Sequence, residues 1–407
     1  MVLKIIAMGI ISNKIKGLEE SATLAMTKKS RELKAQGIDV INLSIGEPDF
    51  NTPDFIKEAA KTAIDENYTH YTPVAGYQEL REAITKKLKR DNGLDYTANQ
   101  IVVSTGAKQS ISNVFTSILN PGEEVIIPAP YWVSYADMVK LSEGKPVIIK
   151  TKISNDFKVM PSEIEQAITK NTKAIIFSSP CNPTGTVYTK EELKAIADIF
   201  KNHPEIVIIS DEIYEHINFD SVHESIAQFE EVKNQVVIIN GASKGFAMTG
   251  WRLGFMAAPL EIANACIKLQ GQSTSGTNSI AQRAAITAFK AIPKENKEIQ
   301  SMVAAFRSRR DLFIKLLNDI PGFNTNVPQG AFYLFPNVES FLGKTDGVIT
   351  INNATDLVMF ILDKANVALV TGAAFGDPNC IRFSYATSEE TLKEAASRIK
   401  TACALLK

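Results

Sequence analysis

The chain has 407 residues, of which 45% are hydrophobic and 22% are charged, and its formal net charge is -1. This length suits one large domain with a smaller partner, and the composition is ordinary for a soluble globular protein. A net charge near zero gives no electrostatic case for nucleic acid or an anionic membrane as a partner.

The chain begins with an apolar segment, residues 1–11, that is too short to span a bilayer and has no cleavage pattern after it. Met8 is an equally good first residue, which leaves open whether residues 1–7 belong to the native protein. A helix is predicted over residues 18–36 and one short strand follows it before Thr52.

Short apolar runs then alternate with longer helical stretches. The predicted helices include residues 107–119, 189–201 and 262–270. The predicted strands are residues 101–103, 124–127, 174–177, 206–209, 236–239 and 253–256. Near-continuous, β-branched runs are typical of strands buried on both faces of a mostly parallel sheet. The alternation predicts an α/β domain with helices on both sides of the sheet.

The last part of the chain has a different pattern. A long charged helix is predicted over residues 294–317, followed by strands at 331–335 and 381–385 and a closing helix. We assign residues 52–293 to a large domain, and residues 1–51 and 294–407 to a smaller α+β domain built from both ends. In open α/β sheets ligands bind beyond the carboxyl ends of the strands, so the residues after each strand matter most.

Lys244 follows the strand at 236–239, and Arg252 lies eight residues further on. A poorly solvated lysine loses proton affinity and becomes a nucleophile toward carbonyl groups, while a guanidinium suits a phosphate dianion. The pair indicates a Schiff-base lysine for a phosphorylated aldehyde, which is how pyridoxal phosphate is held. Taken alone, such a pair is more often a surface lysine and arginine beside a turn.

Two other turns carry polar residues after strands. The small residues Gly106 and Ala107 lead from the first strand into a helix, where backbone N–H groups attract phosphate. Two prolines flank the segment around Asn182, whose amide is able to donate to the phenolate oxygen of a pyridoxal ring. An ordinary strand-to-helix turn and an ordinary Asn-Pro turn are the alternatives.

Asp211 ends the strand at 206–209 and is costly to bury without a cation. A protonated pyridine nitrogen is such a partner, and Tyr214 is close enough along the chain to reach the ring's phenolic oxygen. The alternative for Asp211 is a helix N-cap. Trp132 suits stacking on a flat ring or core packing, and Arg382 suits a substrate carboxylate or a structural salt bridge.

Metal chemistry is not expected. The four cysteines form no C-x-x-C pair, and the four histidines do not have the spacing of a zinc site. We interpret the cysteines as reduced thiols in a cytoplasmic protein.

Together these motifs resemble the class I/II aminotransferases of fold type I, and most closely the bacterial aspartate aminotransferase branch. The resemblance runs from about Ser21 to the C-terminus. The motifs that carry it are Leu43-Ser44-Ile45-Gly46-Glu47-Pro48-Asp49-Phe50, His70-Tyr71-Thr72-Pro73, Gly106-Ala107-Lys108-Gln109, Tyr131-Trp132-Val133-Ser134-Tyr135, Asn182-Pro183-Thr184-Gly185, Asp211-Glu212-Ile213-Tyr214, Ser243-Lys244, Gly250-Trp251-Arg252 and Arg382.

The resemblance implies a site for pyridoxal 5'-phosphate in which Lys244, Asp211 and Tyr214 are catalytic. Lys244 would bind the cofactor and move the substrate proton, while Asp211 would pair with the pyridinium nitrogen. The implied cofactor-binding residues are Gly106, Ala107, Trp132, Asn182, Asp211, Tyr214, Ser243, Lys244 and Arg252, with Tyr71 from the second subunit of a homodimer. The implied substrate-binding residues are Gly46, Lys108, Trp132, Asn182 and Arg382.

The implied reaction is ping-pong transfer of an amino group from L-aspartate to 2-oxoglutarate. Arg382 would bind the α-carboxylate and Lys108 the distal carboxylate. Relatives in this branch also accept arogenate or prephenate, and Thr23 is a residue that would contribute to that activity. Aromatic substrates, and a different reaction such as β-elimination on the same fold, stay open as alternatives.

Overall fold

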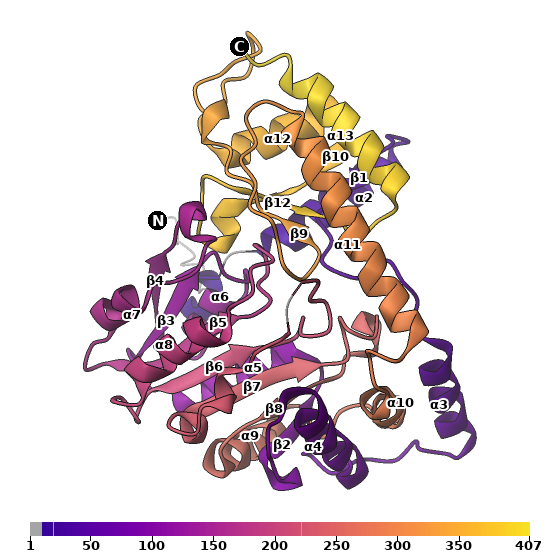
Figure 1. Cartoon of the computed structure of the whole chain (residues 1–407), viewed down its shortest axis with the longest axis vertical. Coiled ribbons are helices and arrows are strands. Elements are labelled where there is room, and N and C mark those ends of the chain that lie inside the picture. The colour runs from indigo at the N-terminus through magenta and orange to yellow at the C-terminus, as the bar shows by residue number, and fades with distance from the viewer. Residues whose placement is uncertain (1–9, 19, 221) are drawn as a thin grey trace, which may run out of the picture.

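The computed structural model describes residues 10–18, 20–220 and 222–407. Whether residues 1–7 belong to the native protein is therefore a question about residues outside the described ranges. Figure 1 shows a broad layered part around a central sheet and a narrower part above it that contains both α2 (Ala22–Ala35) and the C-terminal helix α13 (Glu389–Cys403). The 22-residue helix α11 (Lys297–Asn318) runs from one part into the other.

The broad part is built on a mostly parallel sheet. In the described part of the chain this sheet has seven strands, and only β8 runs antiparallel to its neighbours. The strands, in their order across the sheet, are β2 (Ile101–Ser104), β8 (Gly254–Ala257), β7 (Val236–Gly241), β6 (Val207–Asp211), β5 (Thr172–Ser178), β3 (Glu124–Ala129) and β4 (Lys145–Lys150). The predicted α/β class and mostly parallel sheet are confirmed.

Alternate residues of each central strand enter two separate cores, because successive side chains of a strand point to opposite faces. Ile208 and Ile238 pack into one core with α4, α8 and α10, whereas Ile209 and Ile239 pack into the other with α5, α6 and α9. The helices of this part are α3 (Asp54–Asp65), α4 (Gln78–Asn92), α5 (Ala107–Ile118), α6 (Tyr135–Leu141), α7 (Pro161–Ala167), α8 (Lys190–Phe200), α9 (Leu260–Ser273) and α10 (Ser279–Lys290).

The narrower part joins both ends of the chain. Strand β1 (Ile41–Asn42) pairs in parallel with β10 (Val367–Ala368), and β12 (Ile381–Ser384) lies between β11 (Val370–Thr371) and β9 (Tyr333–Leu334). Helix α12 (Ala354–Ala365) belongs to this part, whereas α1 (Asn13–Lys16) contacts α6 of the broad part. A separate core forms here, with Phe313 and Phe383 among its members. The division at residues 51/52 and 293/294 stays a prediction.

Among the elements that differ from the sequence prediction, three show a local reason. Strand β4 was not predicted; its aliphatic run covers only residues 147–149, and none of its residues is fully buried at the sheet edge. Strand β9 is shorter than residues 331–335, since Ala331 has a φ of 57° and interrupts the extended backbone. Helix α11 begins at Lys297 because the Asn296 side chain accepts a hydrogen bond from the Ile299 N–H.

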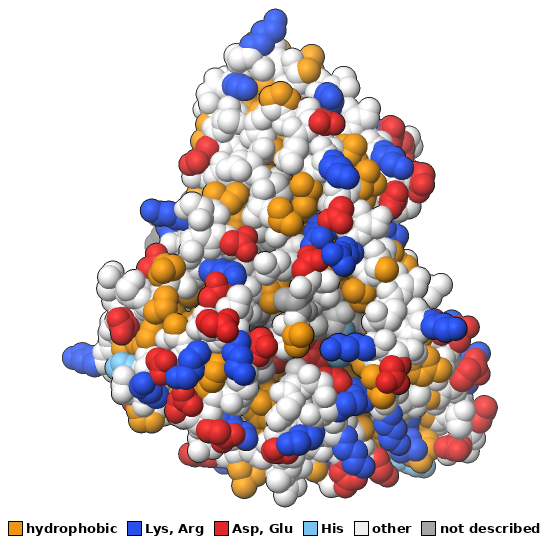
Figure 2. Space-filling model, viewed as in Figure 1, with side chains coloured by type: hydrophobic (Ala, Val, Ile, Leu, Met, Phe, Trp, Pro, Cys, Tyr) orange, Lys and Arg blue, Asp and Glu red, His pale blue; other side chains and the backbone are white. Residues whose placement is uncertain are grey.

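The surface carries no strong charge pattern on the side drawn in Figure 2, where Lys and Arg side chains are interspersed with Asp and Glu. No helix within the described ranges is long and apolar enough to cross a membrane.

Candidate active site

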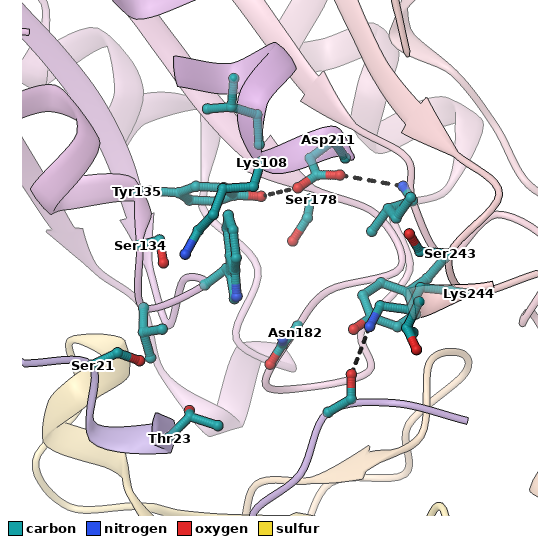
Figure 3. Close-up of a pocket in the computed structure, with 18 of the residues that line it drawn as sticks. Ser21, Thr23, Lys108, Ser134, Tyr135, Ser178, Asn182, Asp211, Ser243 and Lys244 are labelled. Carbon is teal, nitrogen blue, oxygen red and sulfur yellow. Dashed lines mark hydrogen bonds between the residues drawn. The ribbon is translucent and has the colours of Figure 1, made fainter. Parts of the chain in front are cut away.

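A cavity of about 400 Å³ lies beyond the carboxyl ends of β5, β6 and β7, where the two parts of the molecule meet (Figure 3). Of the thirteen residues that the sequence predicts for the site, the cavity is lined by Gly46, Ala107, Lys108, Trp132, Asn182, Asp211, Tyr214, Ser243, Lys244, Arg252 and Arg382. The sheet positions them as expected for an open α/β fold, because the ends of parallel strands share one edge.

Lys244 follows β7 and its Nζ donates a hydrogen bond of 2.6 Å to the backbone oxygen of Gly46. Burial, opposed by the charge of Glu47 and helped by those of Arg382 and Arg252, lowers the pKa of Lys244 to about 8. A lysine with this pKa has a substantial neutral fraction near pH 8, so its amine is available as a nucleophile or a base.

Asp211 is the last residue of β6 and is 5% exposed. Its Oδ2 accepts a 2.6 Å hydrogen bond from the Tyr135 hydroxyl, and its Oδ1 accepts one of 3.3 Å from the Ile213 N–H. Burial raises the pKa of Asp211 to about 6, although both hydrogen bonds oppose that rise. Within the described chain Asp211 forms no salt bridge, so a buried carboxylate faces the cavity without a cation of its own.

Arg382 lies in β12 and is 2% exposed. It donates to Asn182 Oδ1 at 3.1 Å and to the backbone oxygen of Ser44 at 2.6 Å, while its Nε is buried without a partner. Its guanidinium lies 4.7 Å from the ring centre of Tyr333. No carboxylate of the described residues pairs with it, which argues against the structural salt bridge considered above. An unpaired buried guanidinium is suited to an anionic ligand.

The opposite end of the cavity is formed by the start of α5. Gly106 precedes this helix with a φ of 84°, and a Cβ there would lie 2.4 Å from a guanidinium nitrogen of Arg252. Arg252 therefore lies directly against the Gly106 backbone, although Gly106 itself does not line the cavity. Ser243 and Ala107 line the same end. A helix N-terminus beside a guanidinium is a suitable environment for a phosphate group.

The remaining predicted side chains, Tyr214, Lys108 and Trp132, lie on the walls of the cavity. The Tyr214 hydroxyl is 2.8 Å from that of Tyr333, and the Tyr214 ring lies 5.8 Å from Lys244 Nζ. Lys108 Nζ lies 5.1 Å from the Trp132 ring centre, and burial lowers the pKa of Lys108. Lys108 and Trp132 therefore form one cation–π pair on the wall.

Tyr71 is the one predicted side chain that the cavity does not include, and it is 99% exposed in this chain. The sequence reasoning in turn missed two buried tyrosines of the cavity, Tyr135 and Tyr333. Tyr135 ends the motif Tyr131-Trp132-Val133-Ser134-Tyr135, three residues after Trp132. That spacing was the available signal. Tyr333 lay inside a predicted apolar strand, where nothing distinguished it from the core.

A second buried polar cluster lies outside the cavity, behind the segment that follows β6. Asp91, Glu215 and His216 present ligand atoms close enough to share a metal ion, and so do Glu212, Glu215 and His223. The histidine spacing in the sequence gave no sign of this. Lys87 forms a salt bridge with Glu215 and donates to Asn92 Oδ1, so this cluster already contains its own cation.

The four cysteines are all buried and none is paired in a disulfide. Burial raises the pKa of the Cys181 and Cys266 thiols, which makes them poor nucleophiles.

An α/β sheet with a nucleophilic lysine, an unpaired carboxylate and two unpaired guanidinium groups around one cavity is typical of an enzyme acting on anionic carbonyl compounds. The family model for class I and II aminotransferases matches residues 38–399. The chain belongs to this aminotransferase family.

Similar proteins extend the match to nearly the whole chain. A bifunctional aspartate aminotransferase and glutamate/aspartate-prephenate aminotransferase from Petunia hybrida is 47% identical over 98% of this chain and 83% of its own length. An aspartate aminotransferase from Geobacillus stearothermophilus is 47% identical over 96% of this chain and 98% of its own length. The crystal structure of the aspartate aminotransferase from Rhizobium meliloti superposes with a TM-score of 0.94 at 40% identity, covering 98% of this chain and 99% of that one. The predicted family and fold type are confirmed.

Proposed function

We propose that this aminotransferase uses pyridoxal 5'-phosphate to move the amino group of L-aspartate to 2-oxoglutarate. The observation that carries the proposal is the convergence of Lys244, Asp211 and Arg382 on one cavity. The Lys244 amine has a lowered pKa, the buried Asp211 carboxylate has no cation beside it, and the Arg382 guanidinium has no anion beside it. One cofactor with a bound amino acid would supply a partner for all three groups.

The residues of the cavity fit the cofactor. The Asp211 carboxylate would hold a protonated ring nitrogen, and Asn182 and Tyr214, which line the same cavity, would hold the phenolic oxygen. Trp132 offers a flat face for the ring. The phosphate would be held by Gly106, Ala107, Ser243 and Arg252, with Tyr71 of a second subunit as a further donor.

When bound, pyridoxal phosphate supplies the electron sink that stabilises negative charge at the substrate Cα. The protein supplies position and proton transfer. Lys244 Nζ is the group that would take the proton from the substrate Cα and later return it, and the Gly46 oxygen holds this amine in place. Because the same cavity serves both substrates, oxaloacetate leaves before 2-oxoglutarate binds.

Two cations explain a preference for dicarboxylic substrates. Arg382 would bind the α-carboxylate through its fork, using the Nε that has no partner in the structure. Lys108 would bind the distal carboxylate from the wall of the cavity. Aspartate and 2-oxoglutarate both carry two carboxylates, so both half-reactions would use the same pair of cations.

The first test is Lys244→Ala, compared with Lys145→Ala, which removes an exposed lysine from the sheet edge. We expect Lys244→Ala to lose the visible absorbance of the lysine-bound cofactor and to lower transamination by at least about 10³-fold. Lys145→Ala should match the wild type in both measurements. Transamination by Lys244→Ala at a near wild-type rate would show that the assignment is wrong.

Aspartate/prephenate activity is a second candidate, and it is favoured by the name of the Petunia relative and by the position of Thr23 on the cavity wall. A steady-state panel of aspartate, arogenate, tyrosine and alanine with 2-oxoglutarate would separate these donors. A β-elimination activity would instead release keto acid without an added 2-oxo acid acceptor, so assays with and without the acceptor distinguish the two reactions.

We further propose that the enzyme is a cytoplasmic homodimer with shared active sites. The four unpaired cysteines support a reducing compartment. The full exposure of Tyr71, a residue expected at the phosphate, supports a contribution across a subunit boundary.

A further inference from the structure

Tyr135 is the first residue of α6, and its side chain is almost fully buried in the cavity wall. The residue is 1% exposed, and its hydroxyl donates to Asp211 Oδ2 at 2.6 Å (Figure 3). This is a direct contact with the carboxylate that the proposed function assigns to the cofactor nitrogen.

We propose that Tyr135 is a positioning residue that keeps the Asp211 carboxylate ionised and turned toward the cofactor ring nitrogen. The inference rests on the proposed function, because it gives Asp211 a partner only when pyridoxal phosphate binds. Tyr135 touches neither substrate nor reacting atoms in this role. It acts through Asp211.

The geometry fixes the carboxylate from two sides. Tyr135 occupies Oδ2, and the Ile213 N–H contacts Oδ1, so rotation about the Cβ–Cγ bond would break one of these contacts. The Tyr135 N–H also donates to the Trp132 oxygen at 3.0 Å, and the two rings meet edge to face at 5.5 Å. One turn of chain therefore holds both the ring proposed to stack on the cofactor and the donor to Asp211.

The groups around Asp211 leave Tyr135 as its strongest stabilising contact. Tyr135 lies on α6, Cys181 follows β5, Lys244 follows β7, and Glu212 is the next residue along the chain. Burial raises the pKa of Asp211, the Tyr135 hydrogen bond is the largest influence that lowers it, Glu212 raises it and Lys244 lowers it. The pKa of Tyr135 itself is raised far above its usual range by burial, so the phenol stays a donor throughout the neutral range.

Removing the Tyr135 hydroxyl should make the Asp211 carboxyl harder to ionise. Without the Tyr135 hydroxyl, the pKa of Asp211 rises further above its value of about 6. More of the carboxyl is then neutral between pH 6 and 7, and a neutral carboxyl no longer attracts a protonated ring nitrogen. Above pH 8.5 the carboxylate is ionised with or without Tyr135, so the difference shrinks.

The experiment measures the Kd of pyridoxal phosphate for cofactor-free protein from pH 5.5 to 8.5, using the absorbance of the bound cofactor. We expect Tyr135→Phe to move the acid limb upward by about one pH unit, which raises Kd about tenfold near pH 6 and less at pH 8.5. The matched control is Tyr188→Phe, since Tyr188 is a buried tyrosine whose hydroxyl accepts a hydrogen bond from the Val159 N–H, away from Asp211.

Each outcome decides the inference. A Kd ratio of Tyr135→Phe to wild type that is the same at every pH would overturn it, as would a profile equal to that of Tyr188→Phe. In an Asp211→Asn background, Tyr135→Phe should produce no further shift with pH. If Tyr135→Phe does not fold, Tyr135→Met also lacks the donor and carries the same prediction. Failure of the wild type to bind pyridoxal phosphate would instead contradict the proposed function.

Discussion

The floor and the rim of the cavity are built in different ways. On the floor, Asp211 and Arg382 are almost fully buried, and their polar atoms are held by neighbouring side chains and backbone groups. On the rim, Lys108 is exposed, Trp132 is partly exposed, and the two form a cation–π contact. Tyr71, which we propose joins the rim of the other subunit's cavity, is fully exposed in its own chain. The floor is thus fixed before any ligand binds, whereas the rim is free to adapt.

This difference has an energetic cause. A change on the floor leaves a buried polar group without its partner, which costs about 1–3 kcal/mol or more for a charged group. A rim group stays partly hydrated, so the loss of one charged hydrogen bond to a ligand there costs about 1.5–3 kcal/mol, and the rest of the protein keeps its contacts. We therefore expect the floor to set the chemistry for all substrates and the rim to set the choice among them.

The largest expected effect is that of Arg382→Lys on the floor. Lysine keeps the charge but lacks the fork that binds a carboxylate through two hydrogen bonds. Disrupting a buried charge pair typically costs about 2–5 kcal/mol, so kcat/KM should fall about 30- to 5,000-fold. The α-carboxylate is common to all amino donors, so the fall should be similar for aspartate and alanine, measured with 2-oxoglutarate as acceptor.

A fall confined to aspartate would contradict the assignment of Arg382 to the α-carboxylate. Thermal unfolding of the same variant supplies the control for folding. The free protein should lose little stability beyond the contacts to Asn182 and Ser44.

Lys108→Met should have a smaller and more selective effect. Loss of one charged hydrogen bond, about 1.5–3 kcal/mol, should lower kcat/KM for aspartate on the order of 30-fold. Alanine lacks a distal carboxylate, so its kcat/KM should stay within about threefold, and Lys108→Arg should retain the preference for aspartate. Equal losses for both donors would remove the distinction between floor and rim.

The sequence indicated the charged residues of the floor better than its buried tyrosines. Strands β5, β6 and β7 are continuous apolar runs, so the polar residues that end them, such as Asp211, are visible as the residues facing a ligand. Arg382 was visible as a charge inside an apolar strand. Such residues are recognisable because burial makes a polar residue anomalous in its local sequence.

What the sequence did not predict depends on contacts between distant segments. The hydrogen bond from Tyr135 to Asp211 joins residues 76 positions apart, and the contact between Tyr214 and Tyr333 joins residues 119 positions apart. The sequence around a tyrosine with apolar neighbours does not indicate which group its hydroxyl contacts. Edge strand β4 was missed for the related reason that its exposure pattern comes from the sheet around it.

The substitution Tyr71→Phe should have the smallest effect on cofactor binding, and it tests which subunit contributes Tyr71 to each cavity. If its hydroxyl reaches the phosphate of the other subunit, Tyr71→Phe should raise the Kd of pyridoxal phosphate about tenfold through the loss of one charged hydrogen bond. Thermal unfolding of the cofactor-free protein should not change, because the side chain is 99% exposed within its own chain.

Mixing variants then locates the contact. A hybrid dimer of Tyr71→Phe and Lys244→Ala chains would contain one site with Lys244 from the first chain and Tyr71 from the second. After random exchange of equal amounts, about a quarter of all sites would be wild type, and these should bind the cofactor with wild-type Kd. If Tyr71 acted within its own chain, every site of the hybrid would lack either Tyr71 or Lys244, and no tight binding would return. Recovery of tight cofactor binding on mixing would therefore show that Tyr71 of the rim contributes to the site of the other subunit. The residues of the floor contribute to the site of their own chain.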